Sequence, residues 1–431
     1  MLDIKFIREN IDKVKKAISD KNIKMDIDRL LEVDKARSAT TREIESLKTE
    51  QNKLSKVKPD EETIAMLKES KNKITALEQE LKNIDEEYFD LMVKVPTVPS
   101  QDVPYGKNDN FNVEVYKWGE PRKFDFPPKS HIELAESLDL IDFSRGAKVA
   151  GYRGYYVKNE AVMLQMGLMM YALEKLIKKG FTPIIPPTLV KEFVLLGSGY
   201  FSGRHYNPEI DEIYKIANSE EKTADGTVKK EDKFLIGTAE PAILGYYSDE
   251  IIDEKKLPMK LCGFSQCYRS EIGSYGKNTK GIYRVHEFMK IEQVAITHAD
   301  PEESEKLHQE LISVAKEMHE DLNIPYRQLM ICTGDLSAGK YKQYDLEAWI
   351  PSMNAYGETG SASNFLDWQS RRLNIRYKDN KETKYVHMLN STAIPSPRML
   401  IAILENYQQA DGSILVPEVL QKYLPNKIIK R

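Results

Sequence analysis

Apolar residues in the first hundred positions recur with alternating spacings of three and four. Positions 67, 70, 74, 77, 81, 84, 88 and 91 hold Leu, Ser, Ile, Leu, Leu, Ile, Tyr and Leu, the heptad pattern of a coiled-coil seam with one polar exception. A matching upstream seam, interrupted at Arg37, Thr40 and Gln51, consists of Leu30, Val33, Ile44, Leu47 and Leu54. Between the seams, Pro59 can end one helix and Asp60 can cap the next. The pattern therefore predicts an antiparallel helical hairpin.

The two predicted helices differ in charge. The second is rich in Glu and Asp, whereas the end of the first carries Lys48, Lys53, Lys56 and Lys58. In one interpretation, opposite charges pair across the seam of a solvated coiled coil. In the other, the lysines contact RNA phosphates. The residues alone leave both interpretations open.

Periodicity changes after the hairpin. Residues 101–128 continue a stretch rich in Pro, Asn, Asp and Gly and predict a linker between an arm at 1–100 and a globular domain at 129–431. In that domain a predicted helix at 161–179 leads into FTPIIPPTLV, whose prolines indicate an edge strand or a bulge. The methionines of this helix fit either a core or an interface: Met163, Met166, Met169 and Met170. A polar excursion at 206–230 contains the hairpin-turn signal Asp225-Gly226.

The segment from Cys267 to Glu292, CYRSEIGSYGKNTKGIYRVHEFMKIE, combines strand patterns with unusual polar content. Apolar alternation on either side of a loop containing Gly276 and Lys277 predicts two antiparallel strands. Arg269 and Arg284 offer planar charged groups suited to phosphate. Phe288 offers a stacking face. An ordinary surface hairpin is the alternative. The GKNT sequence lacks the glycine spacing of a P-loop, and the Rossmann fingerprint is absent.

Composition limits the class of protein. The chain has 431 residues and a net charge of −4, so it gives no global basic signal for nucleic acid, although a local patch would suffice. Cys262, Cys267 and Cys332 are too few and too irregularly spaced for a disulfide framework or a four-ligand zinc site. The charged N-terminus and the shortness of the longest uncharged apolar stretch, 161–173, predict a cytoplasmic protein without membrane association.

Four ordered segments and the helical arm carry a resemblance to a known family. Besides the segment at 267–292, these are GTAEP (237–241), ETGSASNFLDWQSRRLNIRY (358–377) and HMLNSTAIPSPRMLIAILENYQ (387–408). They resemble the motifs of class II aminoacyl-tRNA synthetases, and in detail those of seryl-tRNA synthetases. The resemblance implies an α+β fold, in which an N-terminal antiparallel coiled-coil hairpin precedes an antiparallel β-sheet domain flanked by helices. It also implies a homodimer, formed through the helix and proline-rich strand near 161–190.

The resemblance implies ATP-dependent activation of serine to seryl-adenylate and transfer to the 3′ end of tRNA(Ser), with tRNA(Sec) as a further candidate acceptor. In this family the arm binds the long variable arm of the tRNA, which favours RNA contact for the arm lysines. Divalent metal, Mg²⁺, is expected at Glu358 and Ser361. Arg269, Glu358 and Arg398 carry the expected catalytic roles. The expected ATP-binding residues are Arg269, Ser270, Glu271, Arg284, Val285, Phe288, Glu358, Thr359, Gly360, Ser361 and Arg398.

Serine selection is expected from a second set of residues. These are Thr238, Ala239, Glu240, Arg269, Glu292, Asn390 and Thr392. An acid suits the ammonium and short polar groups suit the hydroxyl, and such a pocket rejects analogues that leave its polar groups unpaired. Pro241 directly after Thr-Ala-Glu is unusual for the family and is expected to affect local geometry. Two rival functions are amino-acid loading of a carrier protein and a non-catalytic RNA-binding role. The retained arm argues against the first, and the presence of Arg269, Glu358 and Arg398 argues against the second.

Overall fold

The chain folds into two compact units, Met1–Pro96 and Thr97–Arg431. The computed structural model describes residues 1–56, 60–217, 220–222, 224–272, 280–380 and 382–431. Each unit is described by itself below.

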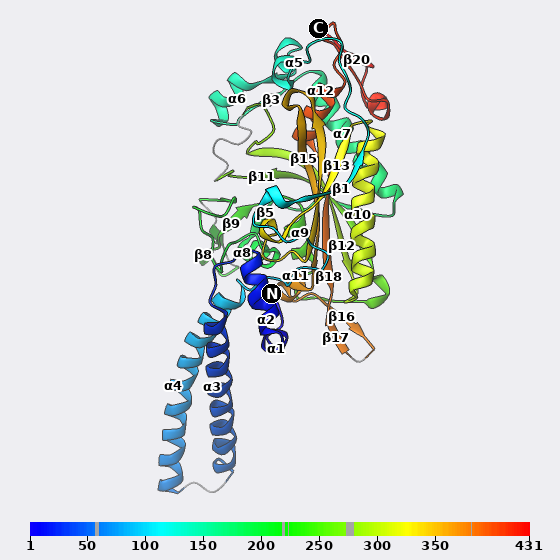
Figure 1. Cartoon of the computed structure of the whole chain (residues 1–431). Coiled ribbons are helices and arrows are strands. Elements are labelled where there is room, and N and C mark those ends of the chain that lie inside the picture. Colours follow the sequence, from blue (N-terminus) through cyan, green and yellow to red (C-terminus); the bar gives the residue numbers. More distant parts are fainter. Residues whose placement is uncertain (57–59, 218–219, 223, 273–279, 381) are drawn as a thin grey trace. The chain divides into compact units, whose positions relative to one another are not determined.

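The N-terminal unit is helical. Its helices are α1 (Ile4–Glu9), α2 (Ile11–Asp20), α3 (Ile27–Leu54) and α4 (Glu61–Met92). The long helices α3 and α4 run antiparallel, as the heptads predict (Figure 1). The seam positions of α4 from Leu67 to Tyr88 are buried or half-buried, while most positions between them are exposed. The Asp60 carboxylate accepts a hydrogen bond from the Thr63 backbone N–H at 2.8 Å, which confirms the predicted cap.

An eight-stranded sheet organises the second unit, with the strand order β1-β13-β14-β15-β18-β12-β11-β4. The strands are β1 (Val113–Trp118), β4 (Thr182–Ile184), β11 (Met259–Tyr268), β12 (Glu287–Thr297), β13 (Tyr326–Met330), β14 (Lys342–Ile350), β15 (Ala355–Leu366) and β18 (His387–Pro395). Neighbours pair antiparallel except at the β4 edge, where Pro183 lies opposite Cys262 in a parallel pair. An edge position tolerates proline because one side of the strand needs no ladder hydrogen bond. The antiparallel pair β11–β12 confirms the hairpin expected around residues 267–292.

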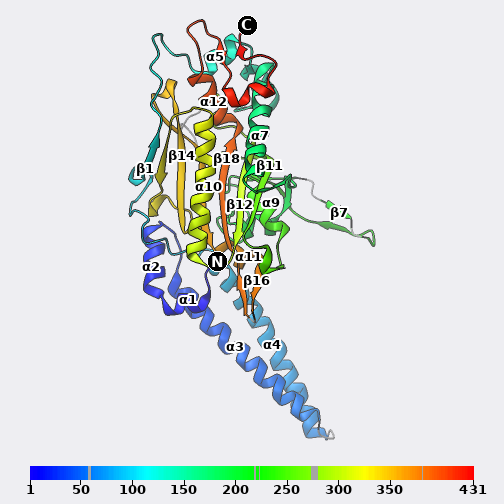
Figure 2. The ribbon, with the colours of Figure 1, turned by 90° about the vertical axis from the view of Figure 1, so that its right-hand side faces the viewer.

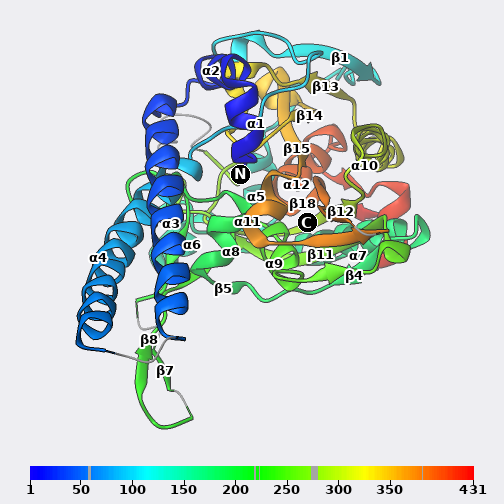
Figure 3. The same ribbon diagram turned by 90° about the horizontal axis from the view of Figure 1, so that it is seen from below.

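Helices cover the sheet. They are α5 (His131–Ser137), α6 (Phe143–Ala150), α7 (Glu160–Lys178), α8 (Glu192–Ser198), α9 (Glu240–Tyr246), α10 (Pro301–Asp321), α11 (Trp368–Leu373) and α12 (Ser396–Asn406). The largest core cluster joins α7, α10 and α12 to one face of the sheet, and α10 runs along that face (Figure 2). Ile291 and Ala295 of β12 belong to this cluster, whereas Val294 and Ile296 pack with Ile243 of α9. Alternate residues of β12 therefore face opposite layers, and α10 is seen nearly end-on beside the sheet in Figure 3.

Short elements complete the unit. The remaining strands are β2 (Ile141–Asp142), β3 (Tyr156–Val157), β5 (Leu189–Lys191), β6 (Tyr214–Lys215), β7 (Glu220–Lys222), β8 (Val228–Lys230), β9 (Lys233–Leu235), β10 (Ile251–Ile252), β16 (Arg376–Asp379), β17 (Glu382–Tyr385), β19 (Ile414–Leu415) and β20 (Ile428–Ile429). The 3₁₀ helices are η1 (Asp109–Phe111), η2 (Glu254–Lys256), η3 (Thr333–Asp335), η4 (Pro351–Met353) and η5 (Glu418–Tyr423). The antiparallel pair β7–β8 confirms the expected hairpin, and Gly226 at its turn has φ +82°.

Two expectations from composition meet the structure. All three cysteines are buried free thiols. Within the ranges that the structure describes, no helix combines the length and apolar character needed to cross a membrane.

Candidate active site

The expected site residues converge on four neighbouring strands of the large sheet. Arg269 follows β11, Glu292 lies on β12, Thr392 on β18 and Glu358 on β15, and these strands are adjacent in the order β15-β18-β12-β11. Arg398 lies in the first turn of α12, directly after β18. The sheet order therefore brings together residues from Arg269 to Arg398, which are 129 positions apart in sequence. Gly276 and Lys277 of the connecting loop lie outside the described residues.

Arg269 is placed beside the aromatic residue expected to stack on adenine. Its guanidinium carbon lies 5.6 Å from the centre of the Phe288 ring, and its Nε donates to the Gly237 carbonyl oxygen at 3.4 Å. Within the described part of the chain Arg269 makes this one side-chain hydrogen bond, and its length exceeds the usual N–H···O range. Most of the five guanidinium donors can therefore turn to a phosphate.

Arg398 forms an ion pair with Glu358. Its Nη1 lies 2.9 Å from Glu358 Oε2, and its guanidinium lies 4.8 Å from the centre of the Tyr283 ring. The charge of Arg398 lowers the pKa of Glu358 and outweighs the opposing effect of burial. Glu358 is therefore a carboxylate at neutral pH.

A bulge in β15 determines which side chains share the face of the site. The pairing of β15 with β14 shifts between Leu346 and Glu347, so that Gly360 and Glu358 take consecutive partners and Thr359 is the extra residue. The Thr359 hydroxyl lies 2.8 Å from His319 Nε2 of α10, and Ala362 packs in a cluster with α10 residues. Glu358 and Ser361, three residues apart, consequently lie on the face opposite α10. The Thr359 side chain does not join them.

The donor set at Glu358 and Ser361 fits Mg²⁺. Magnesium is usually held by one or two carboxylates together with water and substrate phosphates, and all its ligands are oxygens. Asp345 lies opposite Ser361 in the β14–β15 ladder. Burial, and then the charge of Glu358, raise the pKa of Asp345 to about 8, so Glu358 is the ionised acid of this corner at neutral pH. No cluster of three or more His, Cys, Asp or Glu side chains suited to metal occurs in the described ranges.

Glu271, the acid expected near the adenine amino group, is nearly buried between two arginines. Its Oε2 lies 3.2 Å from Nη1 of Arg284 and 3.2 Å from Nη1 of Arg153. Arg153 comes from the turn between α6 and β3 and has only 4 % of its side chain exposed. It was not among the expected site residues, because it lies outside the four recognised segments. Ser270 adds a buried hydroxyl without a hydrogen bond to any described residue, and Val285 is buried nearby.

The residues expected to bind serine include two buried acids, Glu240 and Glu292. Glu240 Oε1 accepts from Gln369 Nε2 at 2.6 Å, and its Oε2 accepts from the Tyr200 hydroxyl at 3.1 Å. Burial, and then the charge of Glu292, raise the pKa of Glu240, although hydrogen bonds from Gln369, Asn390 and Tyr200 oppose the shift. The Thr238 hydroxyl is buried and has no hydrogen-bond partner among the described residues.

Glu292 is held by two neighbours. Its Oε2 lies 2.7 Å from Lys290 Nζ and accepts from the Thr392 hydroxyl at 3.2 Å. Lys290 was missed in the sequence, although its position two residues before Glu292 places both side chains on one face of β12. A Cβ on Gly360 would lie 3.2 Å from Thr392 Cβ, so glycine allows β15 to approach β18 closely here.

Ala239 and Pro241 shape the pocket through the backbone. Ala239 precedes α9 and is fully buried, and a Cβ built on Gly263 would lie 2.6 Å from its Cβ. Pro241 is the second residue of α9. Proline is tolerated in the first helical turn because the N–H groups there lack helical partners. Pro241 therefore fits an ordinary helix start, which is how it affects the local geometry.

The arm lysines differ in their surroundings. Lys48 Nζ lies 2.7 Å from Glu78 Oε1, and further pairs across the helices join Arg29 to Glu87 and Arg37 to Asp85. Charge pairing across the seam is thus present. Lys53 and Lys56 are exposed near the end of α3. Lys58 lies outside the described residues.

Comparisons with known proteins cover the whole chain. The family model of the seryl-tRNA synthetase N-terminal domain matches residues 1–99, and that of the tRNA synthetase class II core domain (G, H, P, S and T) matches residues 222–407. The serine--tRNA ligase of Rubrobacter xylanophilus is 40% identical, covering 100% of this chain and 99% of that protein. The serine--tRNA ligase of Treponema denticola is 42% identical, covering 98% of each. The crystal structure of seryl-tRNA synthetase from Pyrococcus horikoshii complexed with ATP matches with a TM-score of 0.87 at 37% identity, covering 100% of this chain and 99% of that chain.

Proposed function

Because this chain belongs to the seryl-tRNA synthetase family, we propose that it is a serine--tRNA ligase, which activates serine with ATP and transfers it to tRNA. The observation that carries the proposal is a cluster of buried polar side chains, Glu240, Glu292 and Thr238, next to Arg269, whose Nε donates to the carbonyl oxygen of the adjacent Gly237. An ammonium ion suits the two carboxylates, and a hydroxyl suits the unpaired Thr238 side chain. The N-terminal match and the exposed lysines of the arm support tRNA as the acceptor.

The first step is adenylate formation. An oxygen of the serine carboxylate attacks the α-phosphorus of ATP, and the bond from that phosphorus to the bridging oxygen breaks to release pyrophosphate. The chain supplies position and charge instead of a nucleophile. Arg269 stabilises the charge on the α-phosphate, and Arg398 leaves Glu358 for the γ-phosphate. Glu271 accepts a hydrogen bond from the adenine amino group, and Phe288 stacks on the base. Fixed charges of this kind provide most of the acceleration in phosphoryl transfer.

The second step is transfer to tRNA. A hydroxyl of the terminal ribose attacks the activated carbonyl, and AMP leaves as the aminoacyl ester forms. Glu240 and Glu292 retain the serine ammonium throughout, so the carbonyl stays in place for attack. In this proposal Glu358 and Ser361 hold Mg²⁺, which supplies positive charge to the triphosphate when bound. The exposed Lys53 and Lys56 contact the long variable arm of the tRNA. The proposed location is the cytoplasm, where free thiols persist.

Serine should be activated at least about 100-fold faster than alanine, because alanine leaves the buried hydroxyl partners of serine unpaired. The measurement is amino-acid-dependent pyrophosphate exchange with each of the twenty amino acids. Thr238→Ala should reduce the preference for serine over alanine, since it removes one such partner. Equal exchange with serine and alanine by the unaltered protein would contradict the proposed specificity.

The proposed active form is a homodimer. The methionines of α7 divide by position: Met169 is fully buried in the core, whereas Met163 and Met170 are about half exposed. Ile185, directly after β4, is 80 % exposed. Together they give α7 and β4 an exposed apolar surface, and such a surface can pair with its copy across a two-fold axis.

Light scattering at micromolar concentration should give the mass of a dimer. Ile185→Asp should shift the equilibrium toward monomer, because it places a charge in the proposed apolar interface. Val149→Asp, at a similarly exposed position on α6, is the matched control and should leave the mass unchanged. A fully active monomer would refute the proposed interface.

A further inference from the structure

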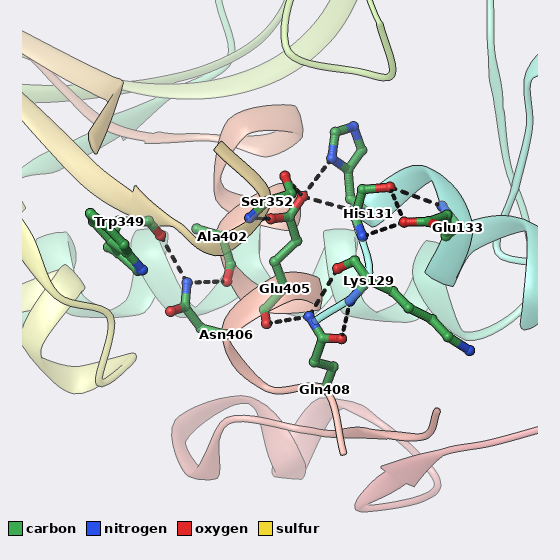
Figure 4. A network of polar contacts seen from close by, with 10 residues as sticks. Lys129, His131, Glu133, Trp349, Ser352, Ala402, Glu405, Asn406 and Gln408 are labelled. Carbon is green, nitrogen blue, oxygen red and sulfur yellow. Dashed lines mark hydrogen bonds and ion pairs between the residues drawn. The ribbon is translucent and has the colours of Figure 1, made fainter. Parts of the chain in front are cut away.

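A buried carboxylate near the end of α12, that of Glu405, binds the first residue of α5 (Figure 4). Glu405 is fully buried, and its Oε1 accepts from the His131 backbone N–H at 2.9 Å, from His131 Nδ1 at 2.8 Å and from the Ser352 hydroxyl at 2.9 Å. Its Oε2 accepts from the Ser352 backbone N–H at 2.9 Å. Burial alone would raise the pKa of Glu405, but these hydrogen bonds outweigh it and lower the pKa. Glu405 is therefore an ionised acceptor that fixes the imidazole of His131.

Neighbouring contacts strengthen this attachment. Gln408 Oε1 accepts from the Lys129 backbone N–H at 2.7 Å, and its Nε2 donates to the carbonyl oxygens of Lys129 and Glu405. Ser352 and His131 both donate to Glu405 instead of to each other. The arrangement therefore lacks the contact that activates a serine nucleophile. What the network does is hold the His131 ring in one orientation.

The opposite edge of that ring lies against the segment that returns to β12. His131 Nε2 is buried and has no hydrogen bond to any residue that the structure describes. A Cβ built on Gly281 would lie 1.9 Å from this nitrogen, far inside van der Waals contact. Gly281 has φ +69°, which also favours glycine. It precedes Ile282, a fully buried residue of the main core, and lies three residues before Arg284.

We propose that His131 is a positioning residue for ATP: its ring, fixed by Glu405, is the surface against which Gly281 packs, and this contact sets the path of the segment carrying Arg284 and Val285. The inference rests on the proposed use of ATP. Arg284 forms an ion pair with Glu271, and the guanidinium of Arg398 lies over the ring of Tyr283. A shift of the chain at Gly281 would therefore move residues expected to contact both the adenine and the phosphates of ATP. The role differs from general core packing because it acts on one ligand.

His131→Asn separates the two edges of the ring. The asparagine amide nitrogen can replace Nδ1 as donor to Glu405, but no atom replaces Nε2 beside Gly281. The KM for ATP in serine-dependent pyrophosphate exchange should rise about tenfold, as expected for a displaced binding segment, while the KM for serine stays within about twofold. Asn406→Ala is the matched control. It removes hydrogen bonds from the same helix end to Trp349 and Ala402 without touching His131, and it should leave both constants unchanged.

Gly281→Ala tests the contact from the other side. Alone it should raise the KM for ATP more than His131→Asn does, because the new methyl group collides with a fixed ring. Combined with His131→Asn it should add no more than about threefold, the part that comes from the left-handed φ at position 281, since the ring edge is gone and residues in contact give non-additive effects. Independent, multiplicative effects of the two substitutions would overturn the inference.

Hydrogen exchange supplies a readout that does not depend on activity. Amides of residues 280–286 should exchange at least about tenfold faster in His131→Asn, and at the unaltered rate in Asn406→Ala, if the ring holds this segment. Unchanged protection in His131→Asn would refute the positioning role. A wild-type protein with no serine-dependent pyrophosphate exchange would instead refute the proposed function, and the exchange of residues 280–286 would still decide the contact.

Discussion

Replacing Arg269 by alanine should lower the rate of serine-dependent pyrophosphate exchange by about 100-fold or more, because it removes a fixed positive charge from the transition state. Among the described residues the side chain has one long hydrogen bond, to Gly237, lies over Phe288 and forms no ion pair, so its loss breaks no close charged contact of the described chain. The substitution should therefore lower kcat while leaving the stability of the folded protein largely unchanged. Thermal unfolding of the variant checks this point.

Arg145→Ala is the matched control for loss of an arginine. Arg145 is 78 % exposed on α6 and pairs with Asp142 in the same turn, outside the proposed site. Its removal should change the exchange rate by less than about twofold, as surface ion pairs contribute little. Exchange by Arg269→Ala at a rate close to that of the control would show that Arg269 does not contact the reacting phosphate.

Deleting residues 1–96 should separate amino-acid activation from tRNA charging. The remaining unit contains the large sheet and its hydrophobic clusters, all formed by residues after position 96. Serine-dependent pyrophosphate exchange should stay within about threefold of the full chain, since a unit with its own core can fold independently. Aminoacylation of tRNA should fall by at least about 100-fold, because contacts that position the tRNA end are lost. Parallel loss of both activities in a folded protein would contradict this division.

A full-length variant refines the same test. Lys53→Glu together with Lys56→Glu keeps both helices but reverses two exposed charges, one in the last turn of α3 and one just after it. The dependence of log tRNA affinity on log salt concentration should become shallower by up to about 2, because fewer counterions are released. Lys48→Gln is the comparison, since Lys48 already pairs with Glu78. Unchanged aminoacylation of tRNA by the deletion variant and by the Lys53→Glu, Lys56→Glu variant would indicate that the arm is only a structural coiled coil.

Local patterns predicted much of this fold. The heptads located α3 and α4, Asp60 marked a cap, and period-two alternation around 267–292 gave the β11–β12 hairpin, because each signal involves residues close in sequence. The resemblance to known motifs predicted site residues that lie on or next to the adjacent strands β15, β18, β12 and β11. Thr359 is different: it was expected with the ATP-binding residues, but its side chain faces His319, since pairing irregularities cannot be read from a motif.

The residues that were not expected from the sequence are those that form ion pairs or hydrogen bonds with expected site residues. Arg153 meets Glu271 from a turn outside the recognised motifs, and Gln369 meets Glu240 from α11. Such contacts depend on the tertiary path of the chain and leave no local pattern. Lys290 is the exception, since its spacing from Glu292 was visible.

The bulge at Thr359 shifts the alternation of side chains along β15 by one residue. Upstream of it, and again downstream, side chains alternate regularly, but the two stretches are out of step by one residue. If all residues of β15 paired with β14 without the bulge, Ser361 would turn toward α10 and Ala362 toward the proposed ATP site, whereas deleting Thr359 alone would leave both facing as they do. Glu358 and Ser361 are three residues apart in sequence but share a face because the bulge absorbs one residue. A change of strand pairing at this point would separate the two proposed metal ligands although every residue of β15 was kept.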